Sequence, residues 1–162
     1  MSTLSYTQNK NITENFIQIC QSLQNNKIYD RPLITSNNKI KLFDDEEEYN
    51  TCDIDLFKFI KQLIKVLELT SSHIVIIFLY IDLISQKVFI SKLNIRNIIY
   101  TASMISLKYL DDIVFSNSTF ASLMNYKERK LAEMEIYFLE AIEFDLKVSC
   151  DDYRSCYNFL IL

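Results

Sequence analysis

The sequence predicts an all-α domain, and three observations support this prediction. First, the chain of 162 residues contains no glycine and a single proline, so tight hairpins that need a positive φ are disfavoured. Second, apolar residues recur at helical spacing along most of the chain, and no segment alternates convincingly with a period of two. Third, 49% of the residues are hydrophobic, which suffices for one domain with its own core. We therefore expect a single helical bundle.

The N-terminal part of the chain predicts an extension that carries one helix. Residues 1–10 are polar, and we expect them to be frayed. An amphipathic pattern predicts a helix over about 11–23. Residues 24–50 are polar, contain the only proline and end in an acidic run, so we expect an extended connector there. These features divide the chain into an N-terminal extension at 1–50 and a helical domain at 51–162.

The helical domain is expected to run from helix to helix. The helix predicted at 72–85 is apolar on all sides, so we expect it to be central and buried. We expect the stretch Thr70-Ser71-Ser72 to cap this helix and Asn94 to cap the next one. Asp151 and Asp152 suit the start of a last helix. The other predicted helices cover about 53–67, 95–111, 118–123 and 127–142.

Composition argues against several classes of protein. The net charge is −4 and no basic patch is visible, so we expect no nucleic-acid partner. A chain without glycine cannot form a Gly-rich phosphate loop, and four cysteines without C-x-x-C spacing make a metal site improbable. We therefore expect no enzymatic activity and no cofactor. The single histidine, His73, lacks a Ser or Cys at motif spacing, which favours a buried or capping role.

The sequence also gives an expectation about location. The longest apolar run, 73–84, is too short to span a membrane, so we expect no membrane partner. No basic-then-apolar leader is visible at the start, which predicts a protein of the cytoplasm or nucleus with reduced cysteines.

Two charged residues lie within apolar helix faces. Lys108 follows Met104 by one turn, and Glu135 lies four residues after Leu131 and three before Phe138. An unpaired charge away from water is costly, so each needs a partner. One interpretation is an internal Lys108–Glu135 bridge, which tolerates partial burial. The other is that the pair borders an exposed apolar patch and binds backbone groups of a partner helix.

Three stretches around these charges resemble the cyclins. "TASMISLKYLDDIVFSN" at 101–117 resembles the cyclin-box helix whose lysine binds the kinase, and "MEIYFLEAIEFDL" at 134–146 resembles the helix whose glutamate does the same. "YID" at 80–82 matches the end of the second cyclin-box helix. The chain is most similar to the P/U-type cyclins, related to the fungal phosphate-regulon cyclin. The residues that carry this likeness are Leu93, Asn94, Arg96, Lys108, Asp111, Asp112, Ser116 and Asn117.

The resemblance covers about 51–160 well and 11–50 loosely, and it implies both fold and function. The fold would be a single cyclin box of five helices with an N-terminal helix and an extended lead-in. The function would be a regulatory subunit that binds and activates a cyclin-dependent protein kinase, in the cell cycle or in nutrient and phosphate signalling. By similarity, Lys108 and Glu135 would bind the αC-helix region of the kinase. The further positions that would face the kinase are Tyr109, Leu110, Asp111, Leu139, Phe144 and Leu146.

The sequence departs from the cyclin pattern, for example at Asp82 and at Met124-Asn125, and one alternative function stays open. Asp82 lacks the arginine that pairs with it in many cyclins, because Asp53 stands near that point. The Gly-Gly before the fifth helix is replaced by Met124-Asn125, although an asparagine can adopt a left-handed conformation. The alternative is a cyclin-fold helical adaptor that binds a non-kinase protein or a transcription complex.

Overall fold

The fold is helical throughout the part of the chain that the structure describes. The structure is a computed structural model, and it describes residues 3–25, 40–44, 55–112 and 115–162. Within these ranges there are seven α-helices, one short 3-10 helix and no strand, which confirms the predicted all-α class. The elements are α1 (Thr3–Gln24), η3 (Ile40–Phe43), α2 (Leu56–Val66), α3 (Ser71–Ser85), α4 (Ile95–Leu110), α5 (Asn117–Leu123), α6 (Glu128–Ala141) and α7 (Cys150–Ile161).

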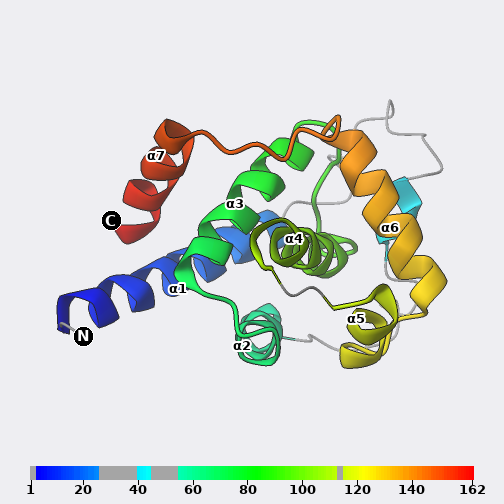
Figure 1. The fold of residues 1–162 in the computed structure, drawn as a ribbon, viewed down its shortest axis with the longest axis horizontal. Coiled ribbons are helices and arrows are strands. Elements are labelled where there is room, and N and C mark those ends of the chain that lie inside the picture. Colours follow the sequence, from blue (N-terminus) through cyan, green and yellow to red (C-terminus); the bar gives the residue numbers. More distant parts are fainter. Residues whose placement is uncertain (1–2, 26–39, 45–54, 113–114) are drawn as a thin grey trace.

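The central helix is α4, not the helix predicted at 72–85. Figure 1 shows α4 nearly end-on in the middle of the molecule, with the other helices around it. Twelve of its residues are buried, from Ile95 to Leu107, whereas α3 leaves Asp82 and Leu83 exposed. The expectation was wrong because α4 contains polar residues that burial normally disfavours. In α4 their hydroxyls are satisfied internally, as Ser103 donates to the carbonyl of Ile99 at 2.7 Å.

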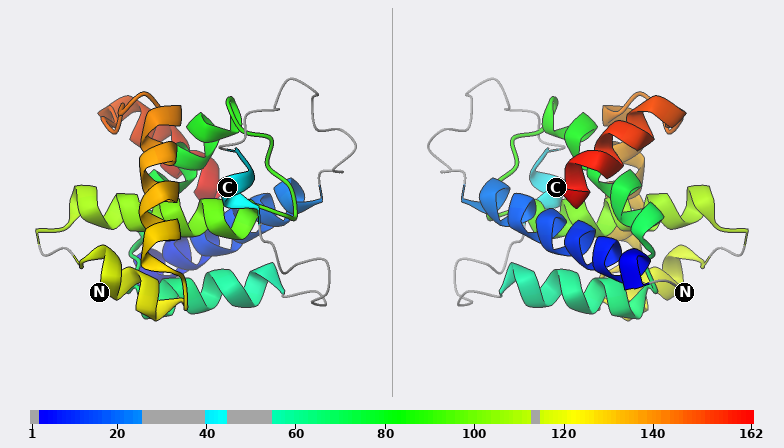
Figure 2. Two further views of the ribbon diagram at one scale, coloured as in Figure 1. Left: turned by 90° about the vertical axis from the view of Figure 1, so that its right-hand side faces the viewer. Right: turned by 90° about the vertical axis from the view of Figure 1, so that its left-hand side faces the viewer.

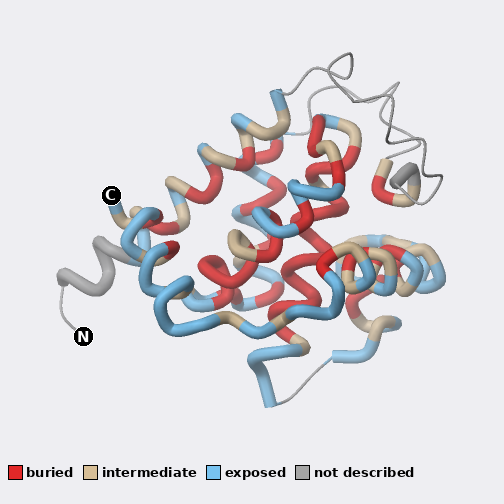
Figure 3. The backbone as a smooth tube through the Cα atoms, turned by 90° about the horizontal axis from the view of Figure 1, so that it is seen from above, coloured by how far each residue is buried: buried red, intermediate tan, exposed pale blue. Residues whose placement is uncertain are grey.

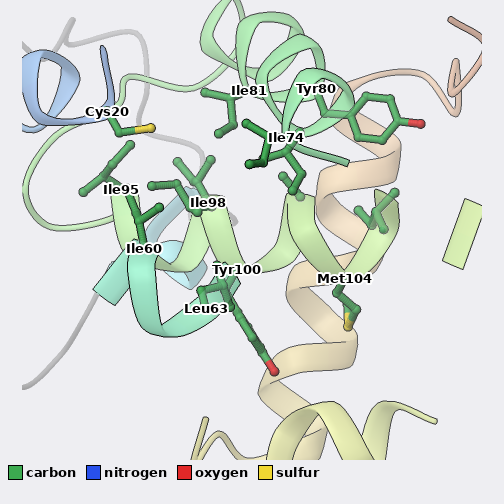
Figure 4. Close-up of a cluster of buried hydrophobic side chains, with 14 of the residues drawn as sticks. Cys20, Ile60, Leu63, Ile74, Tyr80, Ile81, Ile95, Ile98, Tyr100 and Met104 are labelled. Carbon is green, nitrogen blue, oxygen red and sulfur yellow. The ribbon is translucent and has the colours of Figure 1, made fainter. Parts of the chain in front are cut away.

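One hydrophobic core joins the helices (Figure 4). Cys20 of α1, Ile60 of α2, Ile81 of α3 and Ile98 of α4 all belong to it, although they are far apart in the sequence. Figure 3 shows the same arrangement in the backbone, with buried segments inside and exposed turns outside. Helix α1 packs against α2, α3 and α7, so the N-terminal helix is part of the bundle (Figure 2).

The structure corrects the prediction for the N-terminal extension in two places. Helix α1 begins at Thr3, well before the predicted start at Asn11, because no proline or glycine interrupts the polar residues before the apolar stripe. The predicted connector contains η3, and its Phe43 is fully buried. Asn97 of α4 holds this turn, since its Nδ2 donates to the Phe43 carbonyl at 2.7 Å. The rest of the connector, 26–39 and 45–50, lies outside the described residues.

One of the two predicted side-chain caps, that of α3, is confirmed. Thr70 is the N-cap of α3 and accepts a hydrogen bond from the His73 amide, while the His73 side chain accepts one from the Thr70 amide. His73 therefore has the predicted capping role. Asn125 adopts the left-handed conformation with φ of 57°. Asn94 precedes α4, but its side chain binds the preceding loop at Ser91 and not the helix.

Candidate functional site

A hydrogen-bonded triad of side chains joins the end of α4 to α5 and α6. Lys108 Nζ donates to Glu135 Oε1 at 2.5 Å and to Asn117 Oδ1 at 2.5 Å. Asn117 Nδ2 donates to Glu135 Oε2 at 2.9 Å. The internal bridge that the sequence suggested is thus present, and a third residue completes it. Asn117 can do this because Ser116 caps α5 and fixes the first turn of that helix beside α4.

The triad is stable inside the protein yet still open to a partner. The side chains of Lys108 and Glu135 are 25% and 15% exposed, so both charges are mostly removed from water and need each other. An ammonium group has three N–H donors, and the triad uses two of them. The carboxylate of Glu135 likewise keeps lone pairs beyond the two it uses. The same pair can therefore bind a carbonyl and an amide of another protein.

Exposed apolar side chains follow the two charged residues of the triad in the sequence. Tyr109 and Leu110 follow Lys108 at the end of α4 and are 48% and 40% exposed. Phe144 follows α6 and is 63% exposed. We call Lys108, Glu135, Tyr109, Leu110 and Phe144 the triad face. Large apolar groups exposed beside charges are typical of an interaction surface.

The backbone after α6 is held in an unusual conformation that presents Phe144. Glu143 and Phe144 both have positive φ, 58° and 56°, which costs about 1–2 kcal/mol for a residue with a Cβ. The Phe144 amide donates to the Leu139 carbonyl at 2.8 Å and so stabilises this turn. Leu139 and Leu146 are half-buried and pack against the core. Non-glycine residues in this region often occur at functional sites.

Tyr80 anchors the segment that follows Phe144. Its hydroxyl donates to the Leu146 carbonyl at 3.1 Å, which ties α3 to this segment. Burial, with smaller contributions from Tyr109 and Asp145, raises the pKa of Tyr80 above that of a free tyrosine. Tyr109 and Leu110 at the end of α4 line one hollow of the surface together with Val148, two residues after Leu146. The two parts of the triad face are therefore neighbours.

Asp111 lies at the border of this face and is held by His73. It is the C-cap of α4, and its Oδ1 lies 3.1 Å from His73 Nε2. Because His73 Nδ1 accepts from the Thr70 amide, the ring proton is on Nε2 and is donated to Asp111. Asp111 therefore links the end of α4 to the start of α3. This contact was not predicted, because nothing in the sequence relates residues 73 and 111.

The surroundings of Asp82 differ from those of the matching aspartate in many cyclins, which pairs with an arginine. The side chain is exposed, and among the residues that the structure describes it makes no ion pair. The guanidinium of Arg96 lies over the Phe59 ring, 4.8 Å from its centroid. Asp82 is close enough to Cys156 to raise the pKa of that thiol, after the larger effect of burial. Exposure to water removes the need for a partner.

With this geometry described, comparison with known proteins decides the family. The sequence model of the family described as Cyclin matches residues 2–146. The chain belongs to the cyclin family. Members of this family are regulatory proteins and not catalysts. In addition, no helix in the described ranges is long and apolar enough to cross a membrane.

Curated relatives assign the chain to the P/U type. Cyclin-U2-2 of Arabidopsis thaliana is 27% identical over 159 residues, which cover 91% of this chain and 68% of the relative. Cyclin-U4-1 of the same plant is 21% identical over 110 residues, 66% of this chain and 54% of the relative. Cyclin-P4-1 of Oryza sativa subsp. japonica is 22% identical over 99 residues, 59% of this chain and 47% of the relative. The chain spans about half the length of the last two relatives.

Proposed function

We propose that this cyclin binds and activates a cyclin-dependent protein kinase through the triad face. The observation that carries this proposal is the partly exposed Lys108–Asn117–Glu135 triad beside the exposed side chains of Tyr109, Leu110 and Phe144. The free N–H of the ammonium would bind a backbone carbonyl of the kinase αC-helix region, and the carboxylate would bind an amide. Apolar side chains of that helix would contact the aromatic rings.

Binding would activate the kinase by selecting one of its conformations. A kinase is active when its αC helix is turned inward, so that a glutamate of that helix pairs with the lysine that orients ATP. The triad face would bind the inward conformation better than the outward one. Moving an equilibrium from 1:99 to 99:1 requires about 5.5 kcal/mol of differential affinity, which an interface with buried charged hydrogen bonds can supply.

A reconstituted kinase assay tests the proposal. Purified cyclin-dependent kinases would be mixed with the wild-type chain and with Lys108→Ala and Glu135→Ala, and phosphate transfer to a peptide substrate would be measured. We expect the wild type to activate at least one kinase and both variants to lose activation, because removing one partner of an interfacial charge pair costs about 2–5 kcal/mol.

The exposed Arg129–Glu133 pair of α6 provides the matched control. It has the same charge types at 2.9 Å, but its side chains are 92% and 47% exposed. Replacing Arg129 by alanine should leave activation unchanged. If no kinase responds to the wild-type chain, the adaptor function is favoured over kinase activation.

A further inference from the structure

A groove of about 520 Å³ lies beside the triad face, between the end of α4 and α7. Tyr109 and Leu110 line it from α4. Val148 lines it from the segment before α7, and Tyr153 and Tyr157 line it from α7 itself. The two α7 rings stack at 6.3 Å between centroids, so this side of the groove is preformed. A preformed and largely apolar groove can receive an apolar side chain.

The groove is continuous with the triad face, because Tyr109 and Leu110 belong to both. A partner that covers the triad face must therefore reach the mouth of the groove. The opposite side of the groove, from Val148 to Tyr157, lies beyond residue 146, where the match to the cyclin family ends. The groove is thus formed partly by the cyclin box and partly by a helix outside it.

The charges around the groove indicate the chemistry of its occupant. Asp111 and Asp112 follow Leu110 and are exposed, and Asp151 and Asp152 follow the groove residue Cys150 and are exposed. Arg154, which also lines the groove, pairs with Asp151 at 3.6 Å, and Lys108 is neutralised by Glu135. Asp111, Asp112 and Asp152 therefore outnumber the remaining cation of these segments, Lys147. An acidic border around an apolar groove favours a basic partner segment.

From these observations we infer that the groove is a second contact site for the same kinase partner. It takes a branched aliphatic or aromatic side chain of that kinase, flanked in the kinase sequence by arginine or lysine. The inference rests on the proposed function, since the triad face brings the kinase to the groove. Helix α7 thereby gives this cyclin a contact that the shared cyclin box does not supply, and so contributes to the choice of kinase.

Blocking the groove tests this inference with the purified kinase that the wild-type chain activates. Cys150 is exposed, lines the groove and stands in the first turn of α7, so Cys150→Trp should fill the groove without disturbing the core. Ser155→Trp is the matched control, because Ser155 is exposed on α7 and does not line the groove. We expect about a tenfold higher Kd for Cys150→Trp, from calorimetry, and an unchanged Kd for Ser155→Trp.

Thiol labelling gives a second readout without filling the groove. In a Cys52→Ser background, Cys150 is the exposed cysteine, since Cys20 and Cys156 are buried. Added kinase should slow the reaction of Cys150 with a maleimide at least about tenfold, as expected for a thiol covered by a partner.

Each outcome decides between the two proposals. If Lys108→Ala abolishes binding while Cys150→Trp binds like the wild type and Cys150 stays reactive, the groove inference is wrong and the kinase function stands. If the wild-type chain binds no kinase, both proposals fail together. If the chain alone forms a dimer in light scattering and Cys150→Trp dissociates it, the groove belongs to a contact between two copies and the inference is overturned.

Discussion

Exchanging the two charges of the triad should separate its internal role from its role in binding. Asn117 accepts from Lys108 through Oδ1 and donates to Glu135 through Nδ2. If the two charges exchange places, a rotation of the amide by 180° restores both hydrogen bonds. The double variant Lys108→Glu/Glu135→Lys should therefore keep the triad but present reversed charges to a partner.

The magnitude follows from the burial of the pair. With side chains 25% and 15% exposed, a single Lys108→Glu substitution loses hydrogen bonds between charged groups, each worth about 1.5–3 kcal/mol, and places two carboxylates side by side. We expect it to lower the free energy of unfolding by about 3 kcal/mol. For a chain of this size, 1 kcal/mol shifts Tm by about 2–4 °C, so Tm should fall by about 6–12 °C. The double variant should lose less than about 1 kcal/mol.

Urea unfolding followed by circular dichroism measures stability, and calorimetry with the activated kinase measures binding. We expect the double variant to be folded but unable to bind. The control exchange Arg129→Glu/Glu133→Arg, on the exposed pair of α6, should change neither quantity. The reasoning is refuted if the double variant is as unstable as Lys108→Glu alone. It is equally refuted if the double variant binds the kinase like the wild type, because the pair would then have a structural role only.

Three further predictions concern stability. Asn97→Ala removes the buried donor to the Phe43 carbonyl, so it should lower the free energy of unfolding by about 2–3 kcal/mol, measured by urea unfolding. An unchanged urea midpoint would show that η3 does not depend on this hydrogen bond. Tyr80→Phe removes the hydrogen bond to the Leu146 carbonyl and should lower the free energy of unfolding by about 1 kcal/mol. Amide hydrogen exchange should become faster in the segment after α6, which makes exchange the specific measurement. Burial raises the pKa of Cys156 from 9.0 to about 12, so the unfolded chain loses this proton first and stability should fall as pH rises from 9 towards 12. Unfolding curves under reducing conditions between pH 8 and pH 11 should show a smaller fall for Cys156→Ala, and equal slopes for both proteins would contradict the assignment.

The candidate site could be predicted from the sequence only in part. Lys108 and Glu135 are recognisable because each interrupts an apolar helix face, and the resemblance to cyclins gave them a common role. Asn117 is a polar residue at the start of a short helix, where its side chain could equally have faced water. The contact between His73 and Asp111 joins residues 38 positions apart, and no local pattern encodes such a distance. Asp111 was predicted to face a partner, and it also serves the fold.

The same division applies to the fold as a whole. Local patterns determined that the chain is helical, since apolar spacing, caps such as Thr70 and the absence of glycine all act within a few residues. The choice of α4 as the central helix depended on tertiary structure, because hydrophobicity alone favoured α3. A helix can be buried on every side if its small hydroxyls bond to its own carbonyls, as Ser103 does. The burial of Phe43 likewise required the Asn97 amide from a distant helix. Interactions between residues close in the sequence thus determined where the helices form. Which helix lies at the centre was decided by which polar groups could form hydrogen bonds once they were buried.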